Sequence, residues 1–249
     1  MTVGPLTVSD LVVEFIHDGY AIRPLDGLSF EAQAGEFIVL LGPSGCGKTT
    51  LLSCLGGILT PTSGSIHLGD VDVTAMRGKQ LDAYRRDEIG FVFQAFNLIP
   101  SLTARENIAV PLTLTGHGRK ESFARADELL EQVGLGDRGG HLPSKLSGGQ
   151  QQRVAVARGL GHNPPILLAD EPTANLDHIQ AEAIIRVLQG LRADGRMIVV
   201  STHDSRLVPI ADRIVQMVPS GGHDEVPTHE VTLGAGESVF EQGDDSDLV

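Results

Sequence analysis

Short runs of apolar residues recur along the chain, and each ends in a polar or glycine-rich stretch. Continuous apolar runs of four to eight residues predict strands that are buried on both faces, which is typical of parallel sheets. Residues 50–59 and 121–135 instead have apolar positions near helical spacing. We therefore predict an α/β fold. The four apolar runs are EFIVLL at 36–41, IGFVFQ at 89–94, PPILLADEPT at 164–173 and RMIVVSTHD at 196–204.

The first run leads into the pattern Gly42-x-x-x-x-Gly47-Lys48-Thr49, and a helical stretch follows. Strand, glycine loop and helix in this order are the context of a phosphate-binding P-loop. Backbone N–H groups and the helix N-terminus attract phosphate oxygens there. We expect Lys48 to reach the β- and γ-phosphates and the Thr49 hydroxyl to bind Mg²⁺. The alternative is an ordinary glycine-rich turn. Cys46 fills the loop as a small residue; the alternative is a reactive thiol.

The other three runs deliver polar side chains to the edge of the sheet where the P-loop lies. Asp170 is predicted to hold Mg²⁺ and Glu171 to take a proton from attacking water. The alternative is a surface acid pair. His203 is predicted to contact the γ-phosphate, where a lone histidine would more often belong to the core. Gln94 is predicted to reach Mg²⁺ or water with its side-chain amide. Taken alone, Gln94 is evenly balanced between this role and no role in the site.

Composition narrows the class of protein. The net charge is −13, which argues against a nucleic-acid surface. Two cysteines suit a reducing cytosol, and the nine histidines lack metal-type spacing. No apolar run approaches the roughly 18 residues of a spanning helix, and no secretory signal is visible. We expect a soluble protein that meets a membrane only through a partner. None of the four lysines follows Asn or Thr, so the guanine-reading motif of a GTPase is missing.

A second glycine pair opens the predicted helix in KLSGGQQQRVAVARGL at 145–160. The Ser147 hydroxyl can donate to a phosphate, and Gly148 and Gly149 allow backbone N–H groups to approach it closely. The helix that follows directs its positive end to the same place. The alternative, a glycine N-cap on an ordinary helix, accounts for neither the second glycine nor the serine.

These motifs occur in the order and spacing of an ATP-binding cassette ATPase, a family that the chain resembles over roughly residues 6–218. The resemblance is carried by Gly42–Thr49, Gln94, LSGGQ at 146–150, ILLADEP at 166–172, ANLD at 174–177 and His203. It implies a RecA-like P-loop NTPase core with an N-terminal antiparallel β-subdomain and an inserted helical subdomain at about 95–160.

The resemblance also implies how the two glycine loops work together. Two copies of the chain pair head to tail, and each ATP lies between the P-loop of one copy and the Ser-Gly-Gly-Gln segment of the other. The implied catalytic residues are Glu171, His203 and Gln94, and the implied Mg²⁺ ligands are Thr49, Gln94 and Asp170. The implied ATP-binding residues are Phe15, Gly42, Pro43, Ser44, Gly45, Cys46, Gly47, Lys48, Thr49, Thr50, Ser147, Gly148, Gly149, Gln150 and Asp177.

Two assignments within this scheme stay open. The adenine is expected to stack on an aromatic ring before the P-loop, and Phe15 is favoured over Tyr20; the alternative for either ring is core packing. The helical subdomain is expected to receive a short helix from a membrane permease. Phe96, Leu98 and Ile99 are evenly balanced between docking that helix and packing in the core.

The sequence between the motifs resembles most the macrolide-export, lipoprotein-release and cell-division branch of the family (MacB, LolD and FtsE). That branch implies a MacB/FtsX-type permease and a peripheral place at the cytoplasmic face of the membrane. The alternative is the ATPase of a polar amino-acid importer. A non-transport ATPase of translation or DNA repair is a third hypothesis, but such proteins usually have two fused cassettes or a long coiled-coil insertion.

The end of the chain differs in composition from the rest. Residues 1–220 are expected to form the ATPase domain and 221–229 a linker. Residues 230–249, EVTLGAGESVFEQGDDSDLV, resemble the opening strands of a cyclic-nucleotide-binding-type β-roll, which implies that the sequence is part of a longer protein. The alternative is a disordered acidic tail.

Overall fold

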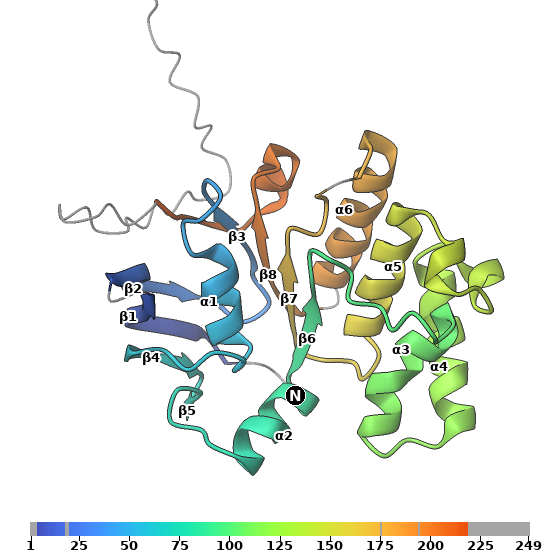
Figure 1. The fold of residues 1–249 in the computed structure, drawn as a ribbon, viewed down its shortest axis with the longest axis horizontal. Helices are drawn as coiled ribbons and strands as arrows, with labels where there is room; N and C mark the ends of the chain where they lie inside the picture. The colour runs from blue at the N-terminus through green and yellow to red at the C-terminus, as the bar shows by residue number, and fades with distance from the viewer. Residues whose placement is uncertain (1–3, 18–19, 175, 194, 219–249) are drawn as a thin grey trace, which may run out of the picture.

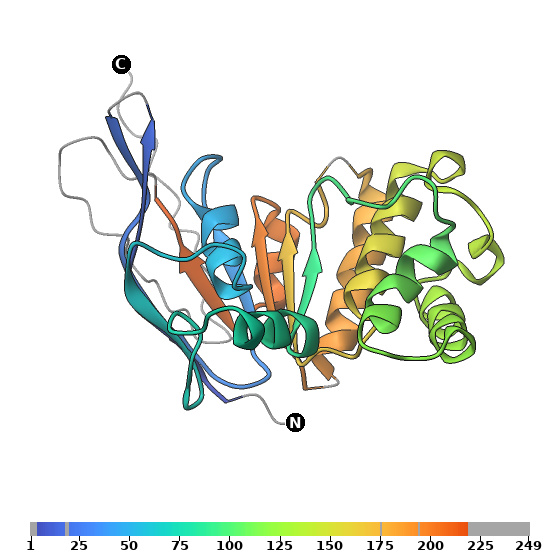
Figure 2. The same ribbon diagram turned by 60° about the horizontal axis from the view of Figure 1, so that its bottom comes forward.

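The structure is a computed structural model that describes residues 4–17, 20–174, 176–193 and 195–218. The linker and tail expected at 221–249 lie outside the described residues. Two sheets stand side by side, with the helices α3, α4, α5 and α6 on the side away from the antiparallel sheet (Figures 1 and 2). The predicted α/β fold with an antiparallel subdomain and inserted helices is confirmed.

The antiparallel sheet has the strand order β2-β1-β4-β5. Its members are β1 (Leu6–His17), β2 (Tyr20–Ala32), β4 (Ser63–Leu68) and β5 (Val71–Asp72). The parallel sheet has the order β6-β7-β8-β3-β9. Its members are β3 (Phe37–Leu41), β6 (Ile89–Val92), β7 (Ile166–Asp170), β8 (Met197–Thr202) and β9 (Arg213–Gln216).

Alternate side chains of the parallel strands enter two different cores, because successive residues of a strand point to opposite faces. In β3, Ile38 and Leu40 join the core under α1 (Lys48–Leu55) and the antiparallel sheet. Phe37 and Val39 join the core formed with the helical region. All four are fully buried, which is why the run is apolar at every position rather than at every second one.

The helical region begins after β6 and returns to the sheet at β7. Helix α3 (Ala104–Leu114) starts in a capping box, in which Thr103 and Glu106 satisfy each other's backbone N–H groups. It packs against α4 (Arg119–Gln132) and α5 (Gly148–Gly159), and α5 in turn lies near α6 (His178–Ala193). Short 3₁₀ turns occur at Gly136–Arg138, Pro143–Lys145 and Ser205–Ile210.

Two boundaries and one helix differ from the sequence expectation. The strand expected to end at Gln94 stops at Val92, and Gln94 lies in a turn. The turn continues into Phe96 and Asn97, whose φ values of 59° and 48° are incompatible with a strand. The helix after the P-loop begins at Lys48, two residues earlier than the apolar pattern. Helix α2 (Lys79–Asp87) was not predicted, because Tyr84 is its only buried residue and gives no periodic signal.

No helix among the described residues is both long enough and apolar enough to cross a bilayer.

Candidate active site

The predicted site residues meet at one edge of the parallel sheet. The strands β7, β8 and β3 are neighbours in the sheet, and all three run in the same direction. Their carboxyl ends therefore lie side by side and bring together Asp170, His203 and the P-loop (Figure 1). Ligands of open α/β sheets bind at this edge.

Two glycines of the P-loop are required by close contacts. Gly47 has a φ of 91°, and a Cβ atom there would lie 2.3 Å from the Pro24 carbonyl oxygen of β2. A Cβ on Gly42 would lie 2.3 Å from the Met217 carbonyl oxygen. At these two positions the loop backbone packs so closely against β2 and Met217 that no side chain fits. Pro43, Ser44 and Gly45 form its exposed tip, Cys46 is buried in the core as a filler, and Thr50 is half-buried in α1.

Lys48 is held inside the loop. Its Nζ donates to the carbonyl oxygens of Gly42 at 2.6 Å and Pro43 at 3.0 Å, and it lies 3.7 Å from Glu171 Oε1. The lysine is 7% exposed, so contacts within the protein, and not hydration, fix the position of its ammonium group. Any phosphate oxygen that enters the loop meets this ammonium group together with free backbone donors.

Thr49 and Asp170 face each other across the sheet edge. The Thr49 hydroxyl lies 3.1 and 2.9 Å from the two carboxylate oxygens of Asp170. Ser201 of β8 also donates to Asp170 Oδ1, so the carboxylate is held by one residue of α1 and one of β8. A buried carboxylate beside a hydroxyl is a set of hard oxygen donors, which is the chemistry that Mg²⁺ prefers.

Glu171 occupies an unusual backbone conformation. Its φ is 45°, and its N–H is accepted by the carbonyl oxygen and the hydroxyl of Ser201. The carboxylate is 12% exposed and sits between Lys48 and His203. His203 Nδ1 lies 3.0 Å from Glu171 Oε2, a contact that is an ion pair when the imidazole is protonated. This buried oxygen accepts no hydrogen bond from the described residues.

His203 and Gln94 both present their side chains to solvent. His203 follows β8 and is 71% exposed, so the core-histidine alternative is wrong. Gln94 is exposed in the turn after β6. Phe96 and Asn97, two and three residues further along, are held by α5, because Arg158 donates to their carbonyl oxygens at 2.9 and 2.5 Å. The segment that carries Gln94 is thus tied to α5.

The second glycine segment forms the start of α5. Ser147 Oγ accepts from the Gln150 N–H at 3.3 Å, and Gln150 Oε1 accepts from the Ser147 N–H at 2.9 Å. This capping box leaves the Ser147 hydroxyl hydrogen free to donate outward, since a hydroxyl both donates and accepts. Ser147 and Gly148 are exposed, whereas Gly149 is buried against Gln180 of α6. The absence of a side chain at Gly149 therefore allows α5 to pack against α6, in addition to any close approach of a phosphate.

Comparison with known proteins agrees with this geometry. A family model described as ABC transporter matches residues 25–174. ABC transporter ATP-binding proteins of Mycobacterium bovis and Mycobacterium tuberculosis are 54% identical over 246 residues, or 99% of this chain and 74% of theirs. One from Thermotoga maritima is 46% identical over 196 residues, or 79% of this chain and 84% of its own. The chain belongs to the ABC transporter family.

A solved structure supports the activity of this ABC ATPase. The dimeric, post-hydrolysis structure of the ATP-binding cassette MJ0796 bound to ADP and Pi superposes with a TM-score of 0.81 at 38% identity. The match covers 87% of this chain and 97% of that one. The predictions of an ABC ATP-binding subunit, of the P-loop fold and of ATPase activity are therefore confirmed.

The aromatic candidates of the ABC ATPase for adenine share one face of the β1–β2 hairpin. Phe15 is the direct partner of Ile22 across the strands, and Tyr20 lies two residues from Ile22. Direct partners and alternate residues lie on the same face. Phe15 is 44% and Tyr20 77% exposed, so core packing is excluded for both. The choice of Phe15 over Tyr20 stays a prediction.

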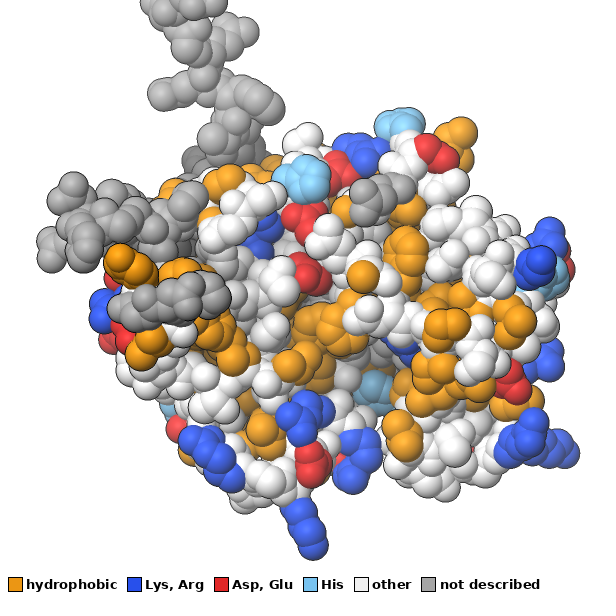
Figure 3. Space-filling view, viewed as in Figure 1, with side chains coloured by type: hydrophobic (Ala, Val, Ile, Leu, Met, Phe, Trp, Pro, Cys, Tyr) orange, Lys and Arg blue, Asp and Glu red, His pale blue; other side chains and the backbone are white. Residues whose placement is uncertain are grey.

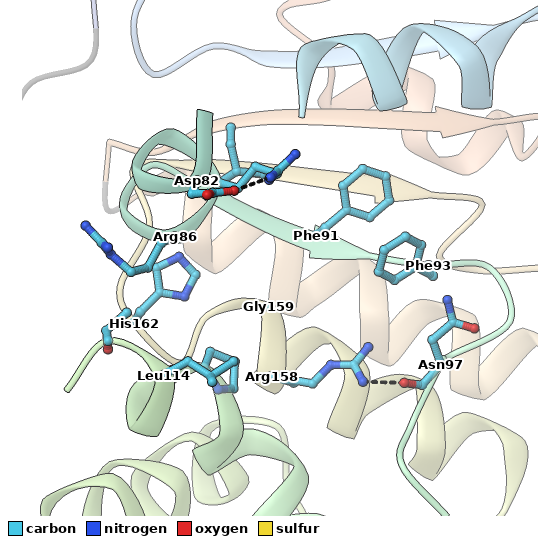
Figure 4. A pocket seen from close by; sticks show the side chains of 13 residues that line it. Asp82, Arg86, Phe91, Phe93, Asn97, Leu114, Arg158, Gly159 and His162 are labelled. Atoms are coloured by element: carbon cyan, nitrogen blue, oxygen red, sulfur yellow. Dashed lines mark hydrogen bonds and ion pairs between the residues drawn. The ribbon is translucent and has the colours of Figure 1, made fainter. Parts of the chain in front are cut away.

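A groove of about 510 Å³ opens where α2, β6 and the Gln94 turn meet the ends of α3 and α5. Figure 3 shows apolar side chains around this hollow and Lys and Arg over α2. In Figure 4 the rings of Phe91 and Phe93 and the side chain of Leu114 face the same space as Arg158. Phe96, Leu98 and Ile99 were evenly balanced between docking a partner helix and packing in the core. Leu98 packs on the core, Phe96 is half-buried and Ile99 is 41% exposed.

Sequence reasoning missed several residues of the site. Ser201 fixes both acids, yet its partner Asp170 lies 31 residues away and no local pattern reports such a contact. Arg158 gave no signal because an arginine near a helix end is common. The capping box of Ser147 and Gln150 had a readable signal, since serine followed three residues later by glutamine marks a helix start.

Proposed function

We propose that the ABC ATPase hydrolyses ATP with Glu171 as the general base, Lys48 on the β- and γ-phosphates and His203 on the γ-phosphate. The observation that carries this proposal is the position of Glu171, whose buried Oε2 accepts no hydrogen bond from the described residues and lies 3.0 Å from His203, while Oε1 faces Lys48. A carboxylate placed beside the phosphate site accepts a proton from attacking water. Gln94 orients water or the metal from the neighbouring turn.

The donor set fits Mg²⁺ as the cofactor. Thr49 and Asp170 supply hydroxyl and carboxylate oxygens within 3.1 Å of each other, and phosphates complete such sites in other proteins. When bound, the ion screens the negative charge of the phosphates. No group of three or more His, Cys, Asp or Glu side chains within the described residues is placed to hold a metal alone. A site that needs the nucleotide is consistent with this.

We further propose that two copies form the complete site head to tail. Ser147 and Gly148 are exposed at the N-terminus of α5 and, with Gln150, are free to contact an ATP held by the P-loop of a partner copy. Asp177 caps α6 through the Gln180 N–H, and its exposed carboxylate lies in the loop expected to cross the dimer. The dimeric cassettes of MJ0796 support this arrangement.

The Glu171→Gln variant tests the proposed function. Loss of the base should lower turnover by about a hundredfold or more while ATP binding is retained. With ATP the variant should then accumulate as a dimer in size-exclusion chromatography. Glu128→Gln, on the exposed face of α4, is the matched control and should behave as wild type. Unchanged turnover of Glu171→Gln would remove this residue as the base.

We propose that the groove receives a short helix of a membrane permease of the MacB/FtsX type, which holds the ATPase at the cytoplasmic face of the membrane. Apolar side chains at the floor and arginines at the rim suit an amphipathic helix. Arg158 links this surface to the Gln94 turn, so docking and the nucleotide site are in contact. An importer of polar amino acids stays the second candidate.

Leu114→Asp tests the docking proposal, because Leu114 is 76% exposed and its replacement leaves the core intact. The variant should lose the permease in affinity purification from membranes while its ATPase activity in isolation is unchanged. Val71→Asp, an exposed apolar position on β5, is the control. Co-purification of a permease with few spanning helices would support the MacB/FtsX type. Co-purification of a six-helix subunit would support the importer. Recovery only with ribosomes or DNA would contradict both.

For residues 230–249 we propose the start of a cyclic-nucleotide-binding-type domain, on the pattern L-x-x-G-E-x-V-F-x-Q-G-D of the sequence. A full-length gene product that ends at residue 249 would contradict the proposal.

A further inference from the structure

Four polar residues near the site form a continuous chain of contacts, which we name the Arg206 bridge: Thr173, Asp204, Arg206 and His178. Thr173 Oγ1 donates to Asp204 Oδ2 at 3.0 Å. Arg206 Nε and Nη2 donate to the Asp204 carboxylate at 2.6–3.1 Å. Arg206 Nη1 lies 2.9 Å from His178 Nδ1, which accepts in the neutral imidazole.

Each part of the bridge adjoins a residue of the proposed site. Thr173 comes two residues after Glu171, Asp204 directly follows His203, and His178 directly follows Asp177. The bridge therefore joins the loop that carries the base, the loop that carries the γ-phosphate contact and the first residue of α6.

The centre of the bridge is firmly held. Asp204 is 13% exposed, and the hydrogen bonds from Arg206 hold the pKa of its carboxyl at about 2, well below the ordinary value. The guanidinium uses its Nε, Nη1 and Nη2 atoms at once, which a lysine cannot reproduce. The far end is different: His178 is 72% exposed, and its Nε2 lies 3.1 Å from Glu182 Oε1.

We propose that the Arg206 bridge fixes His203 relative to the start of α6, so that Arg206 and His178 are positioning residues for ATP hydrolysis. The inference depends on the roles given above to His203 and Asp177. When the loop containing Asp177 meets a partner copy, its position is passed to His203 through the imidazole and the guanidinium. Two sites of a dimer would in this way sense each other through side chains of one chain.

The contacts distinguish this role from plain stabilisation. Helix α6 already has its N-terminal cap in Asp177, which accepts from the Gln180 N–H at 2.8 Å. The exposed imidazole adds no buried area to the core. Removal of the ring should therefore leave the fold and its melting temperature intact and change only the placement of the two loops.

Steady-state kinetics of the purified full chain test the proposal. His178→Ala should lower kcat by about five- to tenfold, the effect of one ordinary hydrogen bond, with KM for ATP unchanged. His178→Asn keeps an acceptor at the δ position and should restore kcat to within about twofold of wild type. Arg206→Lys keeps the charge but loses the fork, and it should resemble His178→Ala.

Arg186→Gln is the matched control, because Arg186 pairs with the same Glu182 on α6 but takes no part in the bridge. It should turn over at the wild-type rate. A wild-type kcat in His178→Ala, or an equal loss in Arg186→Gln, would overturn the proposal. A raised KM in His178→Ala would also overturn it, since the bridge acts on hydrolysis and not on binding. Normal turnover of Glu171→Gln would instead contradict the proposed function.

Discussion

At the scale of single residues, the site depends on contacts between strands that are distant in sequence. Lys48, Asp170 and Glu171 could be assigned from the sequence because their motifs follow apolar strands. The left-handed backbone of Glu171 could not be predicted, because it results from the hydrogen bonds to Ser201 on another strand. Sequence motifs give the residue types at the site, and the sheet order decides which of them meet.

Lys48→Ala should weaken ATP binding itself, by at least about tenfold, because the phosphates lose a charge-assisted contact. Titration with a fluorescent ATP analogue measures the affinity. Lys120→Ala, an exposed lysine of α4, removes the same charge away from the loop and should bind normally. Retained affinity in Lys48→Ala would contradict the assignment of the P-loop.

The lowered pKa of Asp204 predicts a pH effect on stability. A carboxyl whose folded pKa is depressed stabilises the fold fully above its unfolded pKa and loses this contribution as the pH falls through the folded value. The window therefore lies between the ordinary value of 3.8 and about 2. Between pH 4.5 and pH 2 the wild type should lose about 2 kcal/mol more than Asp204→Asn. Equal losses in urea unfolding at the two pH values would contradict this.

At the scale of elements, the four apolar runs gave the central strands correctly, because strands buried on both faces leave a continuous apolar signal. The strand β6 ends two residues earlier than predicted, since the apolar Phe93 continues the run although the strand has already ended at Val92. Helix α2 was missed for the opposite reason, as it lies on the surface with one buried residue.

Helices α3 and α5 both begin in a capping box, and this makes a matched pair of variants. Thr103→Ala and Ser147→Ala each remove a cap and should each lower the free energy of unfolding by about 1 kcal/mol. Only Ser147→Ala should also reduce turnover, by at least about tenfold, because we propose that its hydroxyl donates to the ATP of a partner copy. ATP binding by the dilute chain should be unchanged in both. A similar loss of turnover in Thr103→Ala would reduce Ser147 to a helix cap.

At the scale of the whole molecule, the chain has two glycine loops, one at the start of α1 and one at the start of α5, and the proposal assigns the two loops around one ATP to different copies. The antiparallel sheet, the parallel core and the helical insertion followed from the resemblance in sequence and are present as expected. The groove between α2 and α3 could not be predicted, because its walls come from segments that are separate in the chain.

Dilution tests the pairing of two copies. Far below the dissociation constant of the dimer, the concentration of dimer varies with the square of the chain concentration, so a tenfold dilution should lower the specific ATPase activity about tenfold. Activity per chain is measured at saturating ATP over a wide range of protein concentration. A constant specific activity would contradict the shared site.

Helix α5 begins after Ser147, which we propose contacts the ATP of a partner copy, and carries Arg158 near its other end, in the groove proposed to dock the permease. A helix rises about 1.5 Å and turns about 100° per residue, so the two ends lie roughly 16 Å apart in a fixed angular register. Inserting a single residue between them would rotate the serine by a quarter turn or more relative to the guanidinium. The length of α5 therefore fixes both the distance and the angle between Ser147 and Arg158. We expect this helix to tolerate substitutions far better than insertions or deletions.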